Sequence, residues 1–371
     1  MQQPRVIIAG GGTGGHIFPA VAIGHALKAL VPATELLFVG ALGKMEMEKV
    51  PQEGFKIVGL DIAGFNRSSL LKNIWLPIKL LKSLWAAKRI LKEFNPNVVV
   101  GVGGYASFPM LRAAQSAGIP TLIQEQNSFA GKSNRSLGKK AKAVCVAYDN
   151  MESAFPPAVI IKTGNPVRAL ISQSVVTRDE GLKFWNLDPA RKTLLVVGGS
   201  LGARSVNEAL APVLDQLLAA GLQILWQTGA PFFEEAKAVA KGKEDRVKVV
   251  SFIREMDKGY AAADFAISRA GALAIAELCI VGKPVIFVPY PHAAEDHQTS
   301  NAQALVSKGA AWSIPDAQVK AELPAAILRL LGDEATQSEM RTQLAALAIR
   351  DADRRIAEKV LTLITSNSAR A

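Results

Sequence analysis

Residues 5–16 read RVIIAGGGTGGH, and residues 193–202 read TLLVVGGSLG. Each stretch is a short run that is apolar on both faces, and it is followed by glycines and then by a helical pattern. Such a run is typical of a strand in a parallel sheet that is buried between layers of helices, with a tight turn at its carboxyl end. Because the same opening recurs about 190 residues later, the sequence predicts an α/β protein with two doubly wound domains.

Similar apolar runs fill both halves of the chain. Further strands are predicted at 36–39, 56–60, 98–100, 121–123, 143–147 and 159–161, and then at 223–226, 247–250, 265–267 and 284–288. Helices are predicted over 19–30, 70–94, 205–220 and 345–364. The turn signal Gly164-Asn165-Pro166 places the boundary between domains of residues 1–165 and 166–344.

Length and composition narrow the class of protein. The 371 residues exceed the roughly 250–300 at which single cores stop growing, which agrees with two domains. No apolar stretch reaches the roughly 18–20 residues of a membrane-spanning helix, and residues 1–12 do not resemble a signal peptide. Cys145 and Cys279 stand far apart in apolar surroundings, so neither a disulfide nor a cysteine metal site is expected. We therefore expect a cytoplasmic chain.

The positive charge is concentrated in the first half. The formal net charge is +11. Residues 1–165 contain 19 basic and 9 acidic residues, so they carry 19 − 9 = +10 of this charge. Residues 62–92 contain seven basic residues, no acid, and many leucines. This mixture predicts a segment that lies on anionic lipid, with candidate contacts Ile74, Trp75, Lys79, Lys82 and Trp85. The alternative is a core helix with a basic solvent face. Nucleic acid is disfavoured because no recognition motif is present.

Glycine clusters follow three of the predicted strands, at 10–15, 101–104 and 198–202. Glycines between a strand and a helix expose backbone N–H groups to an anion, although they also simply permit tight turns. The first cluster fits G-x-G-x-x-G, but no acidic residue ends the next strand and no P-loop lysine follows, which disfavours both dinucleotide and P-loop sites. His16 follows this cluster and is the candidate general base. The alternative is a histidine that only caps or packs.

Polar residues follow two strands of the second half. Glu277 suits a bidentate grip on a ribose diol, unless it is an ordinary exposed helical glutamate. His292, Glu295 and His297 match no zinc spacing, so hydrogen bonding is favoured over metal binding. Asp351-Ala352-Asp353 is expected on a solvated helical face rather than at a Mg²⁺–diphosphate site.

Together these motifs resemble the bacterial MurG family of peripheral-membrane N-acetylglucosaminyltransferases. The stretches that carry the resemblance are 11–16, 101–105, 124–127, 164–168, 198–203, 268–277 and 296–298. The resemblance implies a GT-B fold, with two Rossmann-like domains facing a cleft and residues 345–371 packing back on the first. It implies inverting transfer of GlcNAc from UDP-GlcNAc to the C4 hydroxyl of MurNAc in lipid I, on the cytoplasmic face of the plasma membrane. It implies no cofactor and no metal, and it leaves other cell-wall synthesis proteins open as partners.

The resemblance also assigns roles to individual residues. Donor contacts would come from Thr13, Gly14, Gly15, Asn127, Arg168, Ser200, Ile253, Ala272, Leu273, Glu277 and Gln298. Acceptor contacts would come from Gly12, Gly103, Gly104 and Tyr105, with His16 and Glu125 as catalytic candidates. Some members carry histidine at the position of Gln124 and glutamine at that of His297, which weakens catalytic roles for these two. A related GT-B enzyme that uses another nucleotide sugar or another lipid acceptor remains as an alternative. A UDP-GlcNAc epimerase-like enzyme shares the architecture, but its soluble substrate would gain no obvious benefit from the basic amphipathic segment. A non-catalytic module that binds a lipid surface is the third hypothesis.

Overall fold

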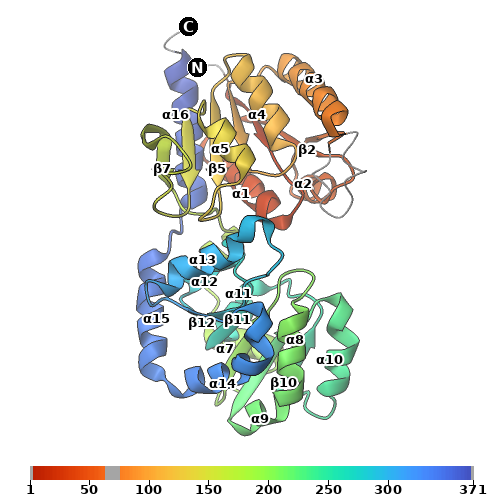
Figure 1. The fold of residues 1–371 in the computed structure, drawn as a ribbon, viewed down its shortest axis with the longest axis vertical. Coiled ribbons are helices and arrows are strands. Elements are labelled where there is room, and N and C mark those ends of the chain that lie inside the picture. Colours follow the sequence, from red (N-terminus) through yellow and green to blue (C-terminus); the bar gives the residue numbers. More distant parts are fainter. Residues whose placement is uncertain (1–2, 63–75, 369–371) are drawn as a thin grey trace. The chain divides into compact units, whose positions relative to one another are not determined.

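A computed structural model describes residues 3–62 and 76–368, and its ribbon is drawn in Figure 1. The chain forms two compact units. Unit 1 extends to Arg168 and resumes at Asp351, and unit 2 is Ala169–Arg350. The sequence placed the corresponding boundaries at 165 and 344. The three additional residues stay with unit 1 because Val167 is buried and the Arg168 guanidinium lies 5.5 Å from the centre of the Phe18 ring.

Unit 1 is built on a parallel sheet with strand order β3-β2-β1-β4-β5-β6-β7. Its strands are β1 (Arg5–Ala9), β2 (Glu35–Ala41), β3 (Ile57–Leu60), β4 (Val98–Gly101), β5 (Thr121–Glu125), β6 (Ala143–Val146) and β7 (Ile160–Lys162). Its helices are α1 (Gly14–Leu30), α2 (Glu46–Gln52), α3 (Leu76–Phe94), α4 (Ser107–Ser116), α5 (Lys132–Gly138) and α16 (Ala352–Ser368). The strand order reverses direction between β1 and β4, so this pair is the switch point at which ligands bind in such sheets.

The C-terminal helix completes the core of unit 1. Ile356, Val360 and Ile364 of α16 join Ile17 and Val21 of α1 in one buried cluster, and Figure 1 shows the blue α16 in the same unit as the red α1. The helix predicted over 345–364 is confirmed from Ala352 onward, where it is α16, but its predicted start is wrong. Instead, α15 (Glu334–Leu347) ends in unit 2, and α16 begins after the chain has crossed between the units.

Unit 2 repeats the architecture with strand order β10-β9-β8-β11-β12-β13, again all parallel. Its strands are β8 (Lys192–Val197), β9 (Leu222–Gln227), β10 (Val247–Val250), β11 (Phe265–Ser268), β12 (Val285–Phe287) and β13 (Trp312–Ser313). Its helices, besides α15, are α6 (Ala169–Ser172), α7 (Arg178–Trp185), α8 (Arg204–Leu210), α9 (Leu214–Ala219), α10 (Phe233–Val239), α11 (Met256–Ala262), α12 (Ala272–Val281), α13 (His297–Val306) and α14 (Val319–Gly332). The strand order reverses direction between β8 and β11, so this pair is the switch point of unit 2.

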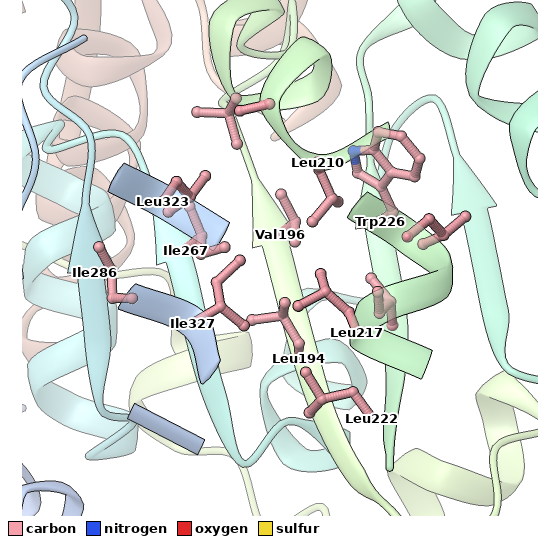
Figure 2. Packing of buried hydrophobic residues seen from close by; sticks show 14 of the residues in the cluster. Leu194, Val196, Leu210, Leu217, Leu222, Trp226, Ile267, Ile286, Leu323 and Ile327 are labelled. Carbon is pink, nitrogen blue, oxygen red and sulfur yellow. The ribbon is translucent and has the colours of Figure 1, made fainter. Parts of the chain in front are cut away.

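The core of unit 2 explains why its strands read as continuous apolar runs. Leu194 and Val196 of β8 lie among Leu210 and Leu217 from one side and Ile327 from another, as Figure 2 shows. The helix predicted over 205–220 is interrupted, because Pro212 lies in a 3₁₀ turn between α8 and α9. Proline has no N–H to continue a helix, which accounts for the break.

Candidate active site

The first two glycine loops meet at the switch point of unit 1. Gly11 donates its N–H to the Gly103 carbonyl oxygen at 3.2 Å. Gly104 has φ of +86°, and a Cβ there would overlap the Gly11 carbonyl. Here the glycines allow two backbones to touch, as the tight-turn interpretation expects. Gly12 differs, because it has φ of +89° and the nearest atom to a Cβ would be Tyr105 Cε2 at 4.0 Å, so it borders open space beside a half-exposed tyrosine.

A buried carboxylate that the sequence analysis missed supports the first loop. Glu46, the first residue of α2, is 1% exposed. Its Oε2 accepts the Gly12 N–H at 2.8 Å, and its Oε1 accepts the Ala41 N–H at 2.9 Å. Gly11 and Gly40 make room for it, since a Cβ at either would collide with the Glu46 side chain. The Gly12 N–H therefore already has an acceptor.

His16 lies in the first turn of α1, next to the contact between Gly11 and Gly103. Its Nδ1 lies 3.1 Å from the Gly11 carbonyl oxygen and 3.4 Å from Thr13 Oγ1. The opposite edge of the ring lies against Gly103, where a Cβ would come within 2.8 Å of Nε2. Thr13 is the N-cap of α1, and Gly14 and Gly15 are its first two residues, where backbone N–H groups have no acceptor within the helix. The structure thus brings His16 together with both glycine loops.

Glu125 ends β5 and is held by amide groups. It is 2% exposed, accepts the Asn134 Nδ2 amide at 2.8 Å, and accepts the Asn127 backbone N–H at 3.1 Å. Burial raises the pKa of this carboxyl group. Gln124 donates from Nε2 to Asn165 Oδ1 at 3.0 Å, which connects β5 to the segment that leads out of unit 1. These contacts shape the loop that carries Asn127.

In unit 2 the glycine loop after β8 lies at the switch point with β11. Gly202 packs against backbone, because a Cβ there would overlap the Thr228 carbonyl. Gly199, with φ of +84°, has no atom within 4 Å of a Cβ position and is exposed, as is Ser200. Ile253 is buried after β10, and its N–H donates to Gln227 Oε1 at 3.2 Å.

The helix after β11 carries three more predicted residues. Ala272 and Leu273 lie in the first turn of α12, and Glu277 lies one turn further on. The alternative of an ordinary exposed glutamate is wrong, because Glu277 is 9% exposed and its Oε2 accepts the Tyr260 hydroxyl at 3.0 Å. This bond fixes the carboxylate in one orientation, as a grip on a diol requires.

Arg269 organises the remaining loop and was missed by the sequence analysis. It donates to the carbonyl oxygens of Val288 and Pro289 at 3.0 and 3.1 Å, and it pairs with Asp316 at 2.5 Å. These bonds secure the start of the segment between β12 and α13. In the first turn of α13, Gln298 Oε1 accepts the Tyr290 N–H at 2.9 Å. Among the residues that the structure describes, no three His, Cys, Asp or Glu side chains gather as a metal site would require.

Helix α3 presents apolar side chains to solvent. Ile78, Leu81 and Trp85 are 45%, 67% and 69% exposed, whereas Ala87, Ile90 and Leu91 face the core. Lys82 is exposed, and Lys79 pairs with Asp61 at 3.2 Å. The other two predicted lipid contacts, Ile74 and Trp75, lie outside the described residues. No helix within 3–62 and 76–368 has both the length and the apolar character to cross a bilayer.

The Asp351–Asp353 motif lies where the chain re-enters unit 1. Asp351 is exposed and pairs with Arg355 at 2.9 Å, as a solvated face predicts. Asp353 departs from that prediction, because it is half-buried in the first turn of α16 and burial raises its pKa.

Comparison with known proteins identifies the family. Residues 6–146 match the glycosyltransferase family 28 N-terminal domain, and residues 193–356 match the family 28 C-terminal domain. The chain belongs to glycosyltransferase family 28. A relative from Bacteroides thetaiotaomicron, named UDP-N-acetylglucosamine--N-acetylmuramyl-(pentapeptide) pyrophosphoryl-undecaprenol N-acetylglucosamine transferase, is 49% identical, with 98% of each chain covered. A relative of the same name from Flavobacterium psychrophilum is 47% identical over both full lengths.

Solved structures agree with the family 28 assignment. The crystal structure of MurG from Acinetobacter baumannii matches with a TM-score of 0.79 and 31% identity, over 97% of this chain and 99% of that one. The predicted resemblance to MurG and the GT-B fold class are therefore confirmed. A UDP-N-acetylglucosamine 2-epimerase matches with a TM-score of 0.65 at 16% identity, which shows a shared fold only.

Proposed function

We propose that the chain transfers GlcNAc from UDP-GlcNAc to the C4 hydroxyl of MurNAc in lipid I, with inversion at the anomeric carbon, and so forms lipid II. Two relatives that are named for such a transfer support this reaction, because each matches the chain over nearly its whole length. The observation that carries the mechanism is the position of His16 between the two glycine loops of unit 1.

The hydrogen bond at Nδ1 gives the His16 ring the tautomer that a base needs. A carbonyl oxygen only accepts, so the 3.1 Å contact with Gly11 places the proton on Nδ1. In the neutral ring, Nε2 then carries the lone pair. Nε2 would take the proton from the acceptor hydroxyl as its oxygen attacks the anomeric carbon, while the bond to the diphosphate breaks on the opposite side.

Unit 2 supplies groups suited to the donor. The N-terminus of α12, at Ala272 and Leu273, offers backbone N–H groups and a positive dipole to the departing diphosphate. Glu277 would grip the ribose, and the exposed Ser200 would contact the diphosphate. Thr13, Gly14, Gly15 and Asn127 of unit 1, with Arg168, would complete the donor contacts.

The test is transfer from radiolabelled UDP-GlcNAc to a lipid I analogue. We expect His16→Ala to lower turnover by roughly 10²–10⁴, the usual effect of losing a general base, with UDP affinity unchanged. His25→Ala is the matched control, since His25 lies on the same helix but is exposed and pairs with Glu53. If the protein released free UDP and an epimerised sugar when no acceptor is present, the epimerase alternative would be favoured. If His16→Ala lowered turnover and UDP affinity equally, His16 would be excluded as the base.

The same proposal places the chain on the cytoplasmic face of the plasma membrane. The exposed residues of α3, with Lys82 beside them, are suited to an anionic lipid surface, where a basic residue contributes about 1 kcal/mol. The pairing of Lys79 with Asp61 reduces the contribution of that lysine. Binding to anionic vesicles that persists without any transfer activity would favour the non-catalytic lipid-surface module.

A further inference from the structure

Glu46 and His16 contact the two sides of one peptide group. The Gly12 N–H donates to Glu46 Oε2 at 2.8 Å, and the Gly11 carbonyl accepts from His16 Nδ1 at 3.1 Å. These two groups belong to the same peptide plane, and in a trans peptide they point in opposite directions. The buried carboxylate, one peptide group and the imidazole therefore form a continuous chain of hydrogen bonds.

Nothing in the local sequence would otherwise hold this peptide in place. It lies between two glycines with φ of +143° and +89°, a pair for which many backbone conformations are accessible. If the peptide turned over, its N–H would face His16 and its carbonyl would face Glu46, so Nδ1 would have to accept. The proton would then move to Nε2, which would no longer have a lone pair for the acceptor hydroxyl.

The second bond of Glu46 fixes the carboxylate itself. Oε1 accepts the Ala41 N–H at 2.9 Å, at the end of β2, so both oxygens are bound and the side chain is 1% exposed. An ionised carboxylate only accepts, and its negative charge favours the Gly12 N–H over a carbonyl at that position. The charge also polarises the peptide, which strengthens the carbonyl as an acceptor for His16.

We propose that Glu46 is a positioning residue for the transfer reaction, which acts through the Gly11–Gly12 peptide to keep the proton of His16 on Nδ1 and the lone pair on Nε2. The inference rests on the proposed role of His16 as the base. It resembles the way a buried carboxylate orients the histidine of a catalytic triad, except that a backbone peptide stands between the two side chains.

The first experiment compares Glu46→Gln with Glu48→Gln in the full-length protein. Glu48 lies on the same helix and its side chain is 70% exposed, so the control loses the same charge. We expect Glu46→Gln to lower kcat for transfer at least tenfold, with KM for UDP-GlcNAc within twofold, and Glu48→Gln to change neither. A kcat equal to that of wild type would overturn the proposal.

A double-mutant cycle separates positioning from general damage to the fold. In the His16→Ala background, Glu46→Gln should cause no further loss of the residual transfer, because the ring that it positions is gone. If the losses multiply, Glu46 acts independently of His16 and the proposal is wrong. If His16→Ala itself retains full turnover, the proposed base is wrong instead, which distinguishes the two failures.

A spectroscopic measurement tests the tautomer without any activity. The chain has four histidines, so the ring nitrogens of His16 can be assigned in ¹⁵N spectra by comparison with His16→Ala. We expect a protonated Nδ1 in the neutral ring of the wild type and a mixture of tautomers in Glu46→Gln. Identical ring-nitrogen shifts in folded wild type and variant would contradict the proposal.

Discussion

Gln227 offers a test of how the donor loops of unit 2 are held. It is the last residue of β9, is 4% exposed, and lies between β8 and β10 in the sheet. Its Nε2 donates to the Gly199 carbonyl at 2.8 Å, and its Oε1 accepts the Ile253 N–H at 3.2 Å. One amide thus connects the glycine loop next to Ser200 with the loop predicted to contact the nucleotide.

Gln227→Leu keeps a similar volume and removes both bonds. The buried Ile253 N–H loses its acceptor, which costs about 1–3 kcal/mol. For a unit of this size, 1 kcal/mol shifts Tm by about 2–4 °C, so we expect a fall of about 2–12 °C. Without the bridge the glycine loop must be ordered by the ligand, and a loss of about 1.4 kcal/mol weakens UDP binding about tenfold.

A matched control lies on the same strand. Gln223 is also buried, and its amide accepts the Asp188 N–H at 2.9 Å and donates to the Asp188 carbonyl at 2.8 Å, at the opposite end of β9. Gln223→Leu should lower Tm by a similar amount and leave UDP affinity unchanged. Calorimetric titration with UDP and thermal unfolding decide the question. The reasoning fails if the two variants weaken UDP binding equally, or if Gln227→Leu lowers Tm without changing the affinity for UDP.

Three further outcomes can be measured. Gly104→Ala should lower the Tm of unit 1 by far more than Gly12→Ala. Both residues have positive φ, which costs an alanine roughly 1–2 kcal/mol, but only at Gly104 would the new Cβ also collide with backbone. Equal shifts in Tm would contradict this reasoning. Trp85→Glu should weaken binding to anionic vesicles roughly ten- to hundredfold and leave transfer to a soluble acceptor analogue unchanged, whereas Val175→Glu, at a 90% exposed site of unit 2, should have no effect on the vesicles. Burial raises the pKa of both cysteine thiols to about 12, so neither should react with a thiol reagent at pH 8 until the protein is unfolded; rapid reaction in the native state would refute their burial.

The parallel strands were predictable because both of their faces are buried. In β8, Leu194–Val197 are buried on both faces of the sheet, so they appear in the sequence as an uninterrupted apolar run, and the turn after them requires glycine. The break at Pro212 could also have been predicted from the proline itself, although the helix predicted over 205–220 included it. The end of α15 had none. Shortly after that end, Arg350 donates to the Ile280 carbonyl at 2.8 Å, a contact between residues 70 apart in sequence that no local pattern reveals.

The residues that brace the site escaped prediction for a related reason. Glu46 and Glu48 stand two residues apart in the same short helix, and only the fold shows that one is buried beneath a glycine loop and the other is in solvent. Arg269 likewise resembles any charged residue after a strand. The residues that face a ligand follow strands and glycines and can be located by pattern, whereas those that hold them depend on tertiary contacts.

The discontinuity of unit 1 has a consequence for synthesis on the ribosome. Helix α1 packs against α16, which is translated only after all of Ala169–Arg350. At roughly 5–20 residues per second, the 182 intervening residues take on the order of 10–40 s. Unit 2 can therefore finish folding first, while the part of α1 that packs against α16 is still uncovered. This interval makes α1 a natural binding site for a chaperone on the nascent chain.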